Sequence, residues 1–295
     1  MRSKSIAVVA TGDMGHAVGR ALVKNGYRVV TSLLGRSQRS SNLATNAGIE
    51  DLGSLEAVAR EADLFLSILP PVAATSLAND MAIAMLGVGR TLVYVDCNAI
   101  APETAAAISK TLGDAGVPFI DAGIIGLAPG MGNPRFYVSG EDTSPMEALD
   151  GCGFKVITIP GGGCQGSAIK MCYAGLTKGT WTLHTSLLLA AEKMGVRQTL
   201  LQEFANSQVD DLRQMEKRLP FIPADAERWI GEMEEIAKCF KEVGVPDGFH
   251  LGAAEIFRIL AQTPFARETR ENIDKNRKLE DVIPVYAKYL SAGSK

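Results

Sequence analysis

Residues 5–26 hold an apolar strand, a turn with two glycines and an amphipathic helix in immediate succession, and this order constrains the fold strongly. The run Ser5-Ile6-Ala7-Val8-Val9 is typical of a buried strand, and residues 10–15 form the turn. The apolar residues of the helix share one face until Asn25-Gly26 ends it: Met14, Val18, Ala21 and Leu22. Dinucleotide-binding α/β sheets begin in this way, so the sequence predicts a nucleotide-binding turn here.

Each glycine of the turn has a predicted task. Gly12 lets the backbone approach a pyrophosphate, and Gly15 lets the helix pack closely on the strand, while the first N–H groups of the helix attract an anion. Ala10 stands where the first glycine of the pattern is usual, and a tight turn with no ligand is the alternative interpretation. The candidate cofactor-binding residues of the turn are Thr11, Gly12, Asp13, Met14 and Gly15.

The end of the second apolar run, residues 28–34, indicates which nucleotide is bound. An NAD site places an acidic residue there to accept the ribose 2′-hydroxyl, but no acidic residue lies between Asp13 and Glu50. The loop instead carries Arg36, Ser37 and Arg39, and guanidinium groups bind a 2′-phosphate through paired, charge-assisted hydrogen bonds. NADP(H) is therefore the predicted cofactor, and a solvated basic loop is the alternative.

Composition and charge exclude several classes of protein. The chain has 295 residues, 46% hydrophobic and 21% charged, which suits two ordinary globular domains. A formal charge of −3 gives no reason to expect nucleic acid or an anionic membrane as partner, and we expect no apolar run of about 18 residues that would span a bilayer. Residues 1–4 contain no signal-like segment. Five cysteines without CxxC spacing predict reduced thiols, no metal site and a cytoplasmic protein.

The order of elements predicts the architecture. Up to about residue 160 strands and helices alternate, as in a doubly wound, mostly parallel Rossmann sheet. Beyond Pro160-Gly161-Gly162-Gly163 helical spacing dominates, so residues 1–160 are predicted to form an NADP-binding α/β domain and residues 161–295 an all-helical domain. The further predicted strands are residues 63–69, 91–96, 117–121, 135–139 and 155–159. The predicted helices are residues 54–62, 73–86, 102–113, 167–194, 198–208, 224–243, 249–260 and 279–290.

Three further segments carry a family resemblance together with the nucleotide turn. They are residues 95–102 (VDCNAIAP), residues 121–126 (DAGIIG) and residues 166–170 (GSAIK). With this order and spacing the chain resembles the β-hydroxyacid dehydrogenase superfamily, which includes 6-phosphogluconate and 3-hydroxyisobutyrate dehydrogenases. It is most similar to a branch related to 6-phosphogluconate dehydrogenase. The resemblance covers nearly the whole chain and implies a homodimer with an active site between its two domains.

The resemblance implies that Lys170 is the general acid/base. In the family this lysine lies one turn into the helix that begins at the domain junction, where the nicotinamide end of the cofactor arrives. An ammonium group that is partly desolvated near a helix N-terminus is disfavoured, so its pKa is expected to fall toward the working pH. Tyr173 and Thr177 follow at helical steps and are candidate substrate-binding residues. Without the resemblance, Lys170 would be read as a solvated surface residue.

Other predicted site residues follow from the same resemblance. Asn98 aligns with a position that faces the nicotinamide ribose and is a candidate for holding a substrate hydroxyl, while an asparagine that closes a turn is the alternative. Leu69 and Pro70 match a segment that lines the adenine side of the cofactor. The segment that binds the substrate acid group corresponds to Gly123, Ile124, Ile125 and Gly126.

The chain departs from the family pattern at three positions besides Ala10. Ile125 replaces a serine of the acid-binding segment, which indicates a substrate less polar at that point. Ala174 replaces the usual asparagine one turn after the lysine, which leaves the orientation of Lys170 open. Where relatives carry Lys-Asp before the last helices this chain has residues 231–235 (GEMEE), and Arg228 is a candidate replacement for that cation. His16, His184 and His250 are read as packing or interface residues.

Together these observations predict an NADP(H)-dependent dehydrogenase or reductase acting on CH–OH groups. It would interconvert a secondary, hydroxyacid-like alcohol and its carbonyl form by hydride transfer. Two alternatives stay open: an imine reductase, against which the retained lysine weighs, and a non-catalytic NADPH-binding protein, which the departures from the pattern favour.

Overall fold

The computed structural model describes residues 5–290, so the prediction about a targeting segment in residues 1–4 lies outside the described residues. The chain divides into two compact units between Tyr173 and Ala174. This division falls within a helix and not at the glycine-rich stretch near residue 160, because the first turns of that helix pack in the N-terminal unit.

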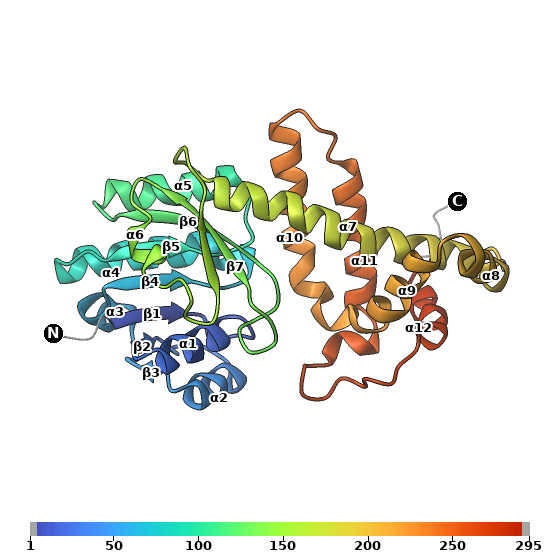
Figure 1. Cartoon of the computed structure of the whole chain (residues 1–295), viewed down its shortest axis with the longest axis horizontal. Coiled ribbons are helices and arrows are strands. Elements are labelled where there is room, and N and C mark those ends of the chain that lie inside the picture. The colour runs from blue at the N-terminus through green and yellow to red at the C-terminus, as the bar shows by residue number, and fades with distance from the viewer. Residues whose placement is uncertain (1–4, 291–295) are drawn as a thin grey trace. The chain divides into compact units, whose positions relative to one another are not determined.

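The N-terminal unit contains an eight-stranded sheet in the order β3-β2-β1-β4-β5-β6-β7-β8 (Figure 1). The strands are β1 (Ser5–Val9), β2 (Arg28–Thr31), β3 (Glu50–Asp51), β4 (Leu64–Ser67), β5 (Val93–Asp96), β6 (Phe119–Ile125), β7 (Arg135–Gly140) and β8 (Lys155–Thr158). All neighbours are parallel except β6 and β7, which are antiparallel. The predicted doubly wound, mostly parallel sheet is confirmed.

Alternate side chains of β1 enter two separate cores, as the period of a strand requires. Ile6 and Val8 belong to one apolar cluster, with residues of α1 (Gly15–Lys24) and α2 (Gln38–Ala47). Ala7 and Val9 belong to the other, with residues of α3 (Leu55–Glu61), α4 (Ala74–Val88) and α5 (Pro102–Asp114). Helices therefore cover both faces of the sheet, and the carboxyl ends of β1, β4, β5 and β6 open at one edge.

Three elements of this unit were not predicted. The helix α2 replaces the expected basic loop, and β3 has only two residues. In α2 only Ala44 and Ala47 are buried, so its sequence lacks the apolar periodicity that indicates a helix. Ser37 accepts a hydrogen bond from the Ser40 backbone N–H and caps the start of α2, and Gly48 ends it with a φ of +75°. The short helix α6 (Ser144–Glu147) was not predicted either.

One segment among residues 5–290, Pro71–Val88, is long and apolar enough to cross a membrane by length and composition, where the sequence analysis expected none. It comprises the 3₁₀ turn η1 (Pro71–Ala73) and α4. Its buried residues, including Leu77, Met81 and Met85, belong to a core cluster of the sheet. Packing against the sheet accounts for these buried residues, whereas Val72, Ile83 and Leu86 of the same segment are exposed.

The helix α7 (Gln165–Lys193) begins in the N-terminal unit and continues into the second (Figure 1). Its 29 residues make it about 43 Å long. The second unit is helical, as predicted, and adds α8 (Arg197–Ser207), α9 (Val209–Arg218), α10 (Pro223–Glu242), α11 (Gly248–Ala261) and α12 (Leu279–Tyr286), with short turns η2 (Leu219–Phe221), η3 (Pro264–Arg267) and η4 (Ala287–Tyr289). Of these, α9 was not predicted. In the core of the second unit the Trp229 ring packs against the rings of Trp181 and Phe257, with centroid distances of 5.2 and 5.3 Å respectively.

Candidate functional site

The two glycines of the first turn have different surroundings. A Cβ atom on Gly15 would lie 1.9 Å from the carbonyl oxygen of Ala10, so only glycine lets α1 approach the end of β1. A Cβ on Gly12 would meet no atom within 4 Å. The predicted packing role of Gly15 is thus confirmed. At Gly12 the glycine is not demanded by the fold, and the space beside it is open to a ligand.

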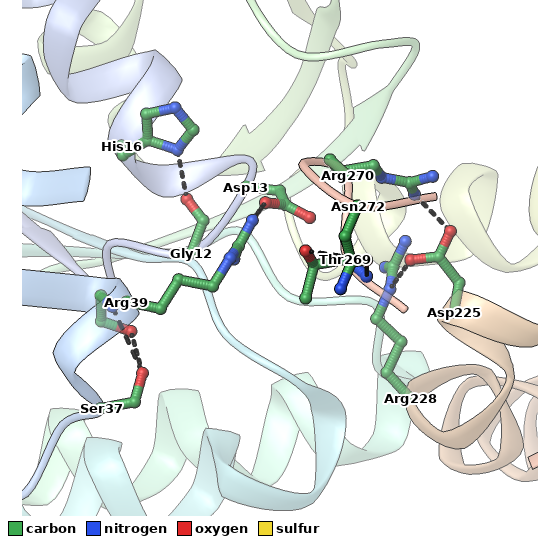
Figure 2. Close-up of polar contacts among 11 residues, drawn as sticks. Gly12, Asp13, His16, Ser37, Arg39, Asp225, Arg228, Thr269, Arg270 and Asn272 are labelled. Carbon is green, nitrogen blue, oxygen red and sulfur yellow. Dashed lines mark hydrogen bonds and ion pairs between the residues drawn. The ribbon is translucent and has the colours of Figure 1, made fainter. Parts of the chain in front are cut away.

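Two side-chain contacts tie this turn to the start of α2. The Thr11 hydroxyl donates to the carbonyl oxygen of Ser40 at 3.0 Å, and Thr11 is only 1% exposed. Figure 2 shows Arg39 reaching Asp13, with an Nη2–Oδ1 distance of 2.5 Å. The side chain of Thr11 therefore braces the turn against the start of α2, and the predicted contact of this residue with a cofactor stays a prediction. Asp13 and Arg39 bring the two predicted nucleotide-binding loops together.

The carbonyl oxygen of Gly12 is occupied within α1. It accepts hydrogen bonds from the His16 backbone N–H at 3.0 Å and from the His16 ring at 2.7 Å (Figure 2). Met14 packs on the core cluster of β1 and α1. The contacts of His16 and Met14 therefore fix the turn, and the unfilled space beside the turn lies at the α-carbon of Gly12.

A groove of about 400 Å³ lies beside the arginine loop. Ser32, Leu34 and Arg36, which follow β2, form one wall. Residues 54–56 at the start of α3, three residues of α4 (Leu77, Asp80 and Ile83) and Val9 at the end of β1 complete the lining. This volume falls within the range of small-molecule sites, and its walls mix apolar and polar side chains as such sites do. Among its lining residues, sequence analysis had picked out only Arg36 as a site residue.

Asn98 is committed to a buried network at the ends of β4 and β5. Its amide group donates to Ser67 Oγ at 2.9 Å and to Asp96 Oδ2 at 3.0 Å. Its carbonyl oxygen accepts from the Leu69 backbone N–H at 2.8 Å, and Asn98 is 2% exposed. Both amide hydrogens are used, so the predicted catalytic and cofactor contacts of this side chain are not supported. The alternative, an asparagine that closes a turn, fits the structure. The hydrogen bond that it accepts from the Leu69 backbone N–H also fixes the position of the segment that contains Leu69 and Pro70.

Lys170 lies at the carboxyl end of β6. Its Nζ donates to the carbonyl oxygen of Ile124 at 2.8 Å. A Cβ on Gly123 would lie 2.1 Å from the carbonyl oxygen of Gly166 and 2.9 Å from Cβ of Lys170, so Gly123 lets α7 pack directly on β6. The ammonium group is therefore held at the same edge of the sheet as the glycine turn and the Leu69 segment.

Asp121 anchors the start of α7 from below. Its carboxylate accepts from the Ser167 backbone N–H at 2.7 Å, from the Ser167 hydroxyl at 2.5 Å and from the Ser139 hydroxyl at 3.2 Å. Ser139 in turn accepts from the Gly166 backbone N–H at 3.1 Å. These contacts satisfy N–H groups that a helix N-terminus otherwise leaves without a partner. Asp121 is the first residue of the segment 121–126, but nothing in the sequence indicated that its carboxylate holds the N-terminus of α7.

Burial raises the pKa of both Asp96 and Asp121, which lie near this edge of the sheet. It raises the pKa of Asp96 to about 7, against hydrogen bonds from Asn98, and the nearby charge of Asp121 adds to the increase. Burial also raises the pKa of Asp121, while the hydrogen bonds from Ser167 and Ser139 oppose it. The two residues lie opposite each other on β5 and β6. Two carboxyl groups are thus buried under the edge where Lys170 lies.

The other predicted substrate contacts are placed as follows. Gly123, Ile124 and Ile125 belong to β6 and pair with β7, and both isoleucine side chains are buried. Gly126 is exposed, with a φ of +120°. Tyr173 is 44% exposed on α7, and the Thr177 hydroxyl donates back to the carbonyl oxygen of Ala174 at 3.3 Å. Their predicted contacts with a substrate stay predictions.

In the second unit, Asp225 accepts from two arginines. Arg228 Nε donates to Oδ1 at 3.0 Å, and Arg270 donates to Oδ2 (Figure 2). Deeper in this unit Lys178 on α7 pairs with Glu232 on α10 at 2.7 Å, and both residues are buried. The sequence analysis missed this ion pair. The signal that could have indicated it was a lysine and a glutamate, each among the apolar residues of a predicted helix. No group of three or more potential metal ligands lies together within residues 5–290.

Sequence comparison assigns families to both parts of the chain. Residues 5–150 match the family described as the NAD binding domain of 6-phosphogluconate dehydrogenase. Residues 191–260 match a family described as a domain of unknown function (DUF1932). The N-terminal unit therefore contains a domain that binds a nicotinamide dinucleotide.

Individual relatives agree with these families. The mitochondrial 3-hydroxyisobutyrate dehydrogenase of Drosophila melanogaster is 24% identical over 202 residues, 67% of this chain and 58% of that protein. This chain thus spans less than two thirds of that relative. Among solved structures, a 3-hydroxyisobutyrate dehydrogenase from Salmonella typhimurium has a TM-score of 0.67 at 15% identity, covering 87% and 93% of the two chains. An imine reductase variant from Myxococcus stipitatus, in complex with NAD⁺, has a TM-score of 0.53 at 13% identity, covering 88% and 93%.

At these identities the solved structures establish the fold alone. The matched families, the order of the motifs and the fold are nevertheless consistent with one another across both units. Residues 5–150 belong to the family of NAD binding domains of 6-phosphogluconate dehydrogenase, and the fold of the chain is similar to that of 3-hydroxyisobutyrate dehydrogenases.

Proposed function

We propose that the protein is an NADP(H)-dependent oxidoreductase that interconverts a secondary, hydroxyacid-like alcohol and its carbonyl form. One observation carries the proposal: the glycine turn after β1 and the Lys170 ammonium near the end of β6 lie at one carboxyl edge of the parallel sheet. In open α/β sheets, ligands bind at this edge. A dinucleotide held there brings its reactive ring toward the lysine.

The residues of the turn fit a pyrophosphate. The open space at Gly12 is a cradle that any Cβ atom would fill, and the N–H groups that begin α1 are available to attract an anion. Arg36 and Arg39 supply two guanidinium groups near the end of β2, where the adenosine ribose is expected. The absence of an acidic residue in that loop supports a 2′-phosphate ligand, and hence NADP(H) in preference to NAD(H).

Lys170 is proposed as the general acid/base. A bound nicotinamide supplies the hydride acceptor during oxidation and the hydride donor during reduction. As a neutral amine, Lys170 Nζ takes the proton of the substrate hydroxyl when the carbinol carbon gives up its hydride, so that a C=O bond forms. In the reverse direction the ammonium returns this proton to the carbonyl oxygen. The carbonyl of Ile124 and the anchor at Asp121 hold the amine in one position for both tasks.

The buried isoleucines of β6 bear on the substrate. Ile125 stands where relatives have a serine of the acid-binding segment, and its buried side chain offers no hydrogen-bond donor there. We therefore propose a substrate whose carbon skeleton is less polar there than a short hydroxyacid. The fold neighbour that reduces imines makes imine reduction an alternative, which a substrate panel tests.

The cofactor is tested by titrating the protein with NADP⁺ and NAD⁺ in parallel by calorimetry. We expect clear preference for NADP⁺, and loss of about 10²- to 10⁴-fold in NADP⁺ affinity when Arg36 and Arg39 are both replaced by alanine, because each charge-assisted hydrogen bond contributes about 1.5–3 kcal/mol. NAD⁺ affinity should stay unchanged. Equal affinity of the native protein for both dinucleotides would contradict the predicted role of the arginines.

The reaction is tested with panels of hydroxyacids, ketones and cyclic imines, followed by NADPH absorbance. Turnover of an alcohol–carbonyl pair is expected, and Lys170→Ala should lower kcat by about 10²–10⁴-fold while NADP⁺ still binds. Lys110→Ala, on the surface of α5, is the matched control. Full activity of Lys170→Ala would remove the lysine from the mechanism, and binding without turnover of any compound would favour a non-catalytic NADPH-binding protein.

A further inference from the structure

The groove beside Arg36 contains a carboxylate that the proposed function has not used. Asp80 lies on the exposed side of α4 and lines the groove. Within residues 5–290 its side chain has no hydrogen-bond or ion-pair partner. A charged acceptor that faces a small-molecule groove without a protein partner is available to a ligand.

The second carboxylate of the groove is already engaged. Glu56 stands in the first turn of α3, where its own backbone N–H and the Ser54 side chain hold its carboxylate and lower its pKa. Such contacts at a helix N-terminus turn a glutamate back on its own helix. Among the residues that the structure describes Asp80 has no such contacts, so its carboxylate is the freer of the two to accept from a ligand.

Apolar side chains make the groove suitable for a flat ring. Leu34, from the loop after β2, is 78% exposed, and Ile83, from α4, is 69% exposed, although both line the groove. Leu55 and Leu77 extend the apolar lining. A planar base inserted between these side chains would cover surface that is otherwise left in water.

The position of Arg36 orients such a base. Arg36 lines the same groove and is one of the two arginines proposed to bind the 2′-phosphate of the ribose. The base is attached to that ribose, so it lies in the part of the groove formed by α3 and α4. The 6-amino group is the strongest hydrogen-bond donor on the edge of adenine, and a carboxylate can only accept.

We propose that Asp80 accepts a hydrogen bond from the 6-amino group of the adenine ring and so makes the protein selective for an adenine dinucleotide. This inference rests on the proposed NADP(H) dependence. It adds a specificity-determining residue on α4 to the arginines after β2. A carbonyl oxygen at the same position of the base would face the carboxylate with no hydrogen between them, which is repulsive.

The test compares NADP⁺ with its deamino analogue, nicotinamide hypoxanthine dinucleotide phosphate, in which a carbonyl oxygen replaces the 6-amino group. Calorimetric titration of the native protein should show about tenfold or weaker binding of the analogue, as expected for the loss of a hydrogen bond to a charged group. In Asp80→Asn the side-chain amide can donate to the carbonyl oxygen, so the ratio of the two affinities should fall to about one or invert. Asp80→Ala should weaken NADP⁺ and abolish the discrimination.

Glu56→Gln is the matched control, because it removes a charge from the same groove and should leave the affinity ratio unchanged. Equal binding of both dinucleotides to the native protein would overturn the inference while leaving the proposed NADP(H) dependence intact. So would loss of discrimination in Glu56→Gln but not in Asp80→Asn. Failure of the native protein to bind either dinucleotide would instead refute the proposed function.

Discussion

Alanine at Gly15 should lower the stability of the protein, whereas alanine at Gly12 should lower only its affinity for NADP⁺, although the two positions belong to one turn. At Gly15 the new Cβ would lie 1.9 Å from the carbonyl oxygen of Ala10, so the two must separate by about 1.5 Å to reach the 3.4 Å of an ordinary contact. Ala10 cannot simply move, because its N–H donates to Ile68 at 3.0 Å. Overpacking of this kind costs about 1–3 kcal/mol, or a fall in Tm of about 3–10 °C for a unit of this size.

At Gly12 the same methyl group meets no protein atom, and the φ of this residue is not in the left-handed region. The stability of Gly12→Ala should therefore stay within about 0.5 kcal/mol of the native protein. The methyl group would fill the space that a pyrophosphate needs, so NADP⁺ affinity should fall about 10-fold or more through lost charge-assisted hydrogen bonds.

Thermal unfolding followed by circular dichroism, without dinucleotide, measures the first effect, and calorimetric titration of NADP⁺ measures the second. A Gly15→Ala protein that melts with the native one would show that α1 does not pack on β1 as described. A Gly12→Ala protein with native NADP⁺ affinity would show that the turn is structural and binds no pyrophosphate.

Three further predictions concern buried charges. Asp121→Ala leaves the backbone N–H and the hydroxyl of Ser167 without their acceptor, so urea unfolding should show a loss of about 3 kcal/mol, and native stability would contradict the anchoring role. Because burial raises the pKa of Asp96 from 3.8 to about 7, the folded state keeps a proton that the unfolded state has lost between about pH 4 and pH 7. Stability should therefore fall as pH rises through that window, and urea titrations at pH 5 and pH 8 should show a weaker fall in Asp96→Asn; equal falls would refute the assignment. Lys178→Met removes the cation beside the buried Glu232 carboxylate and should cost about 3–5 kcal/mol in urea unfolding, most of which Lys178→Met with Glu232→Leu should restore; no recovery would contradict a simple ion pair.

Local pattern was enough to predict most elements of the N-terminal unit. The strand at residues 5–9 and the helix start at Pro102 agree with the structure, because apolar periodicity and a proline at the first helical turn are local signals. Where the local signal is weak the prediction failed. The helix α2 buries only two alanines, and β3 is held by its pairing with β2 and not by its own composition.

The candidate site divides in the same way. Gly12, Gly15 and the arginine loop were identified from spacing along the chain, because a strand–turn–helix unit positions them within a few residues of each other. The contacts of Lys170 with Ile124 and of Asp121 with Ser167 each join residues 46 positions apart. No spacing rule predicts them, since they depend on how α7 packs across the ends of β6 and β7.

The sequence by itself determined that this chain forms a dinucleotide-binding α/β unit followed by helices, because those features arise from local periodicity and turn chemistry. Tertiary structure alone decided which polar side chains remain available to a ligand. Asn98 and Thr11 looked like ligand contacts in the sequence, but the fold uses their hydrogen bonds internally. Asp80 was not singled out in the sequence, and only the tertiary structure places it in a groove beside the loop after β2. Which hydrogen-bonding groups pair with each other depends on contacts between distant segments of the chain. The sequence alone therefore could not identify the groups that are left to bind a ligand.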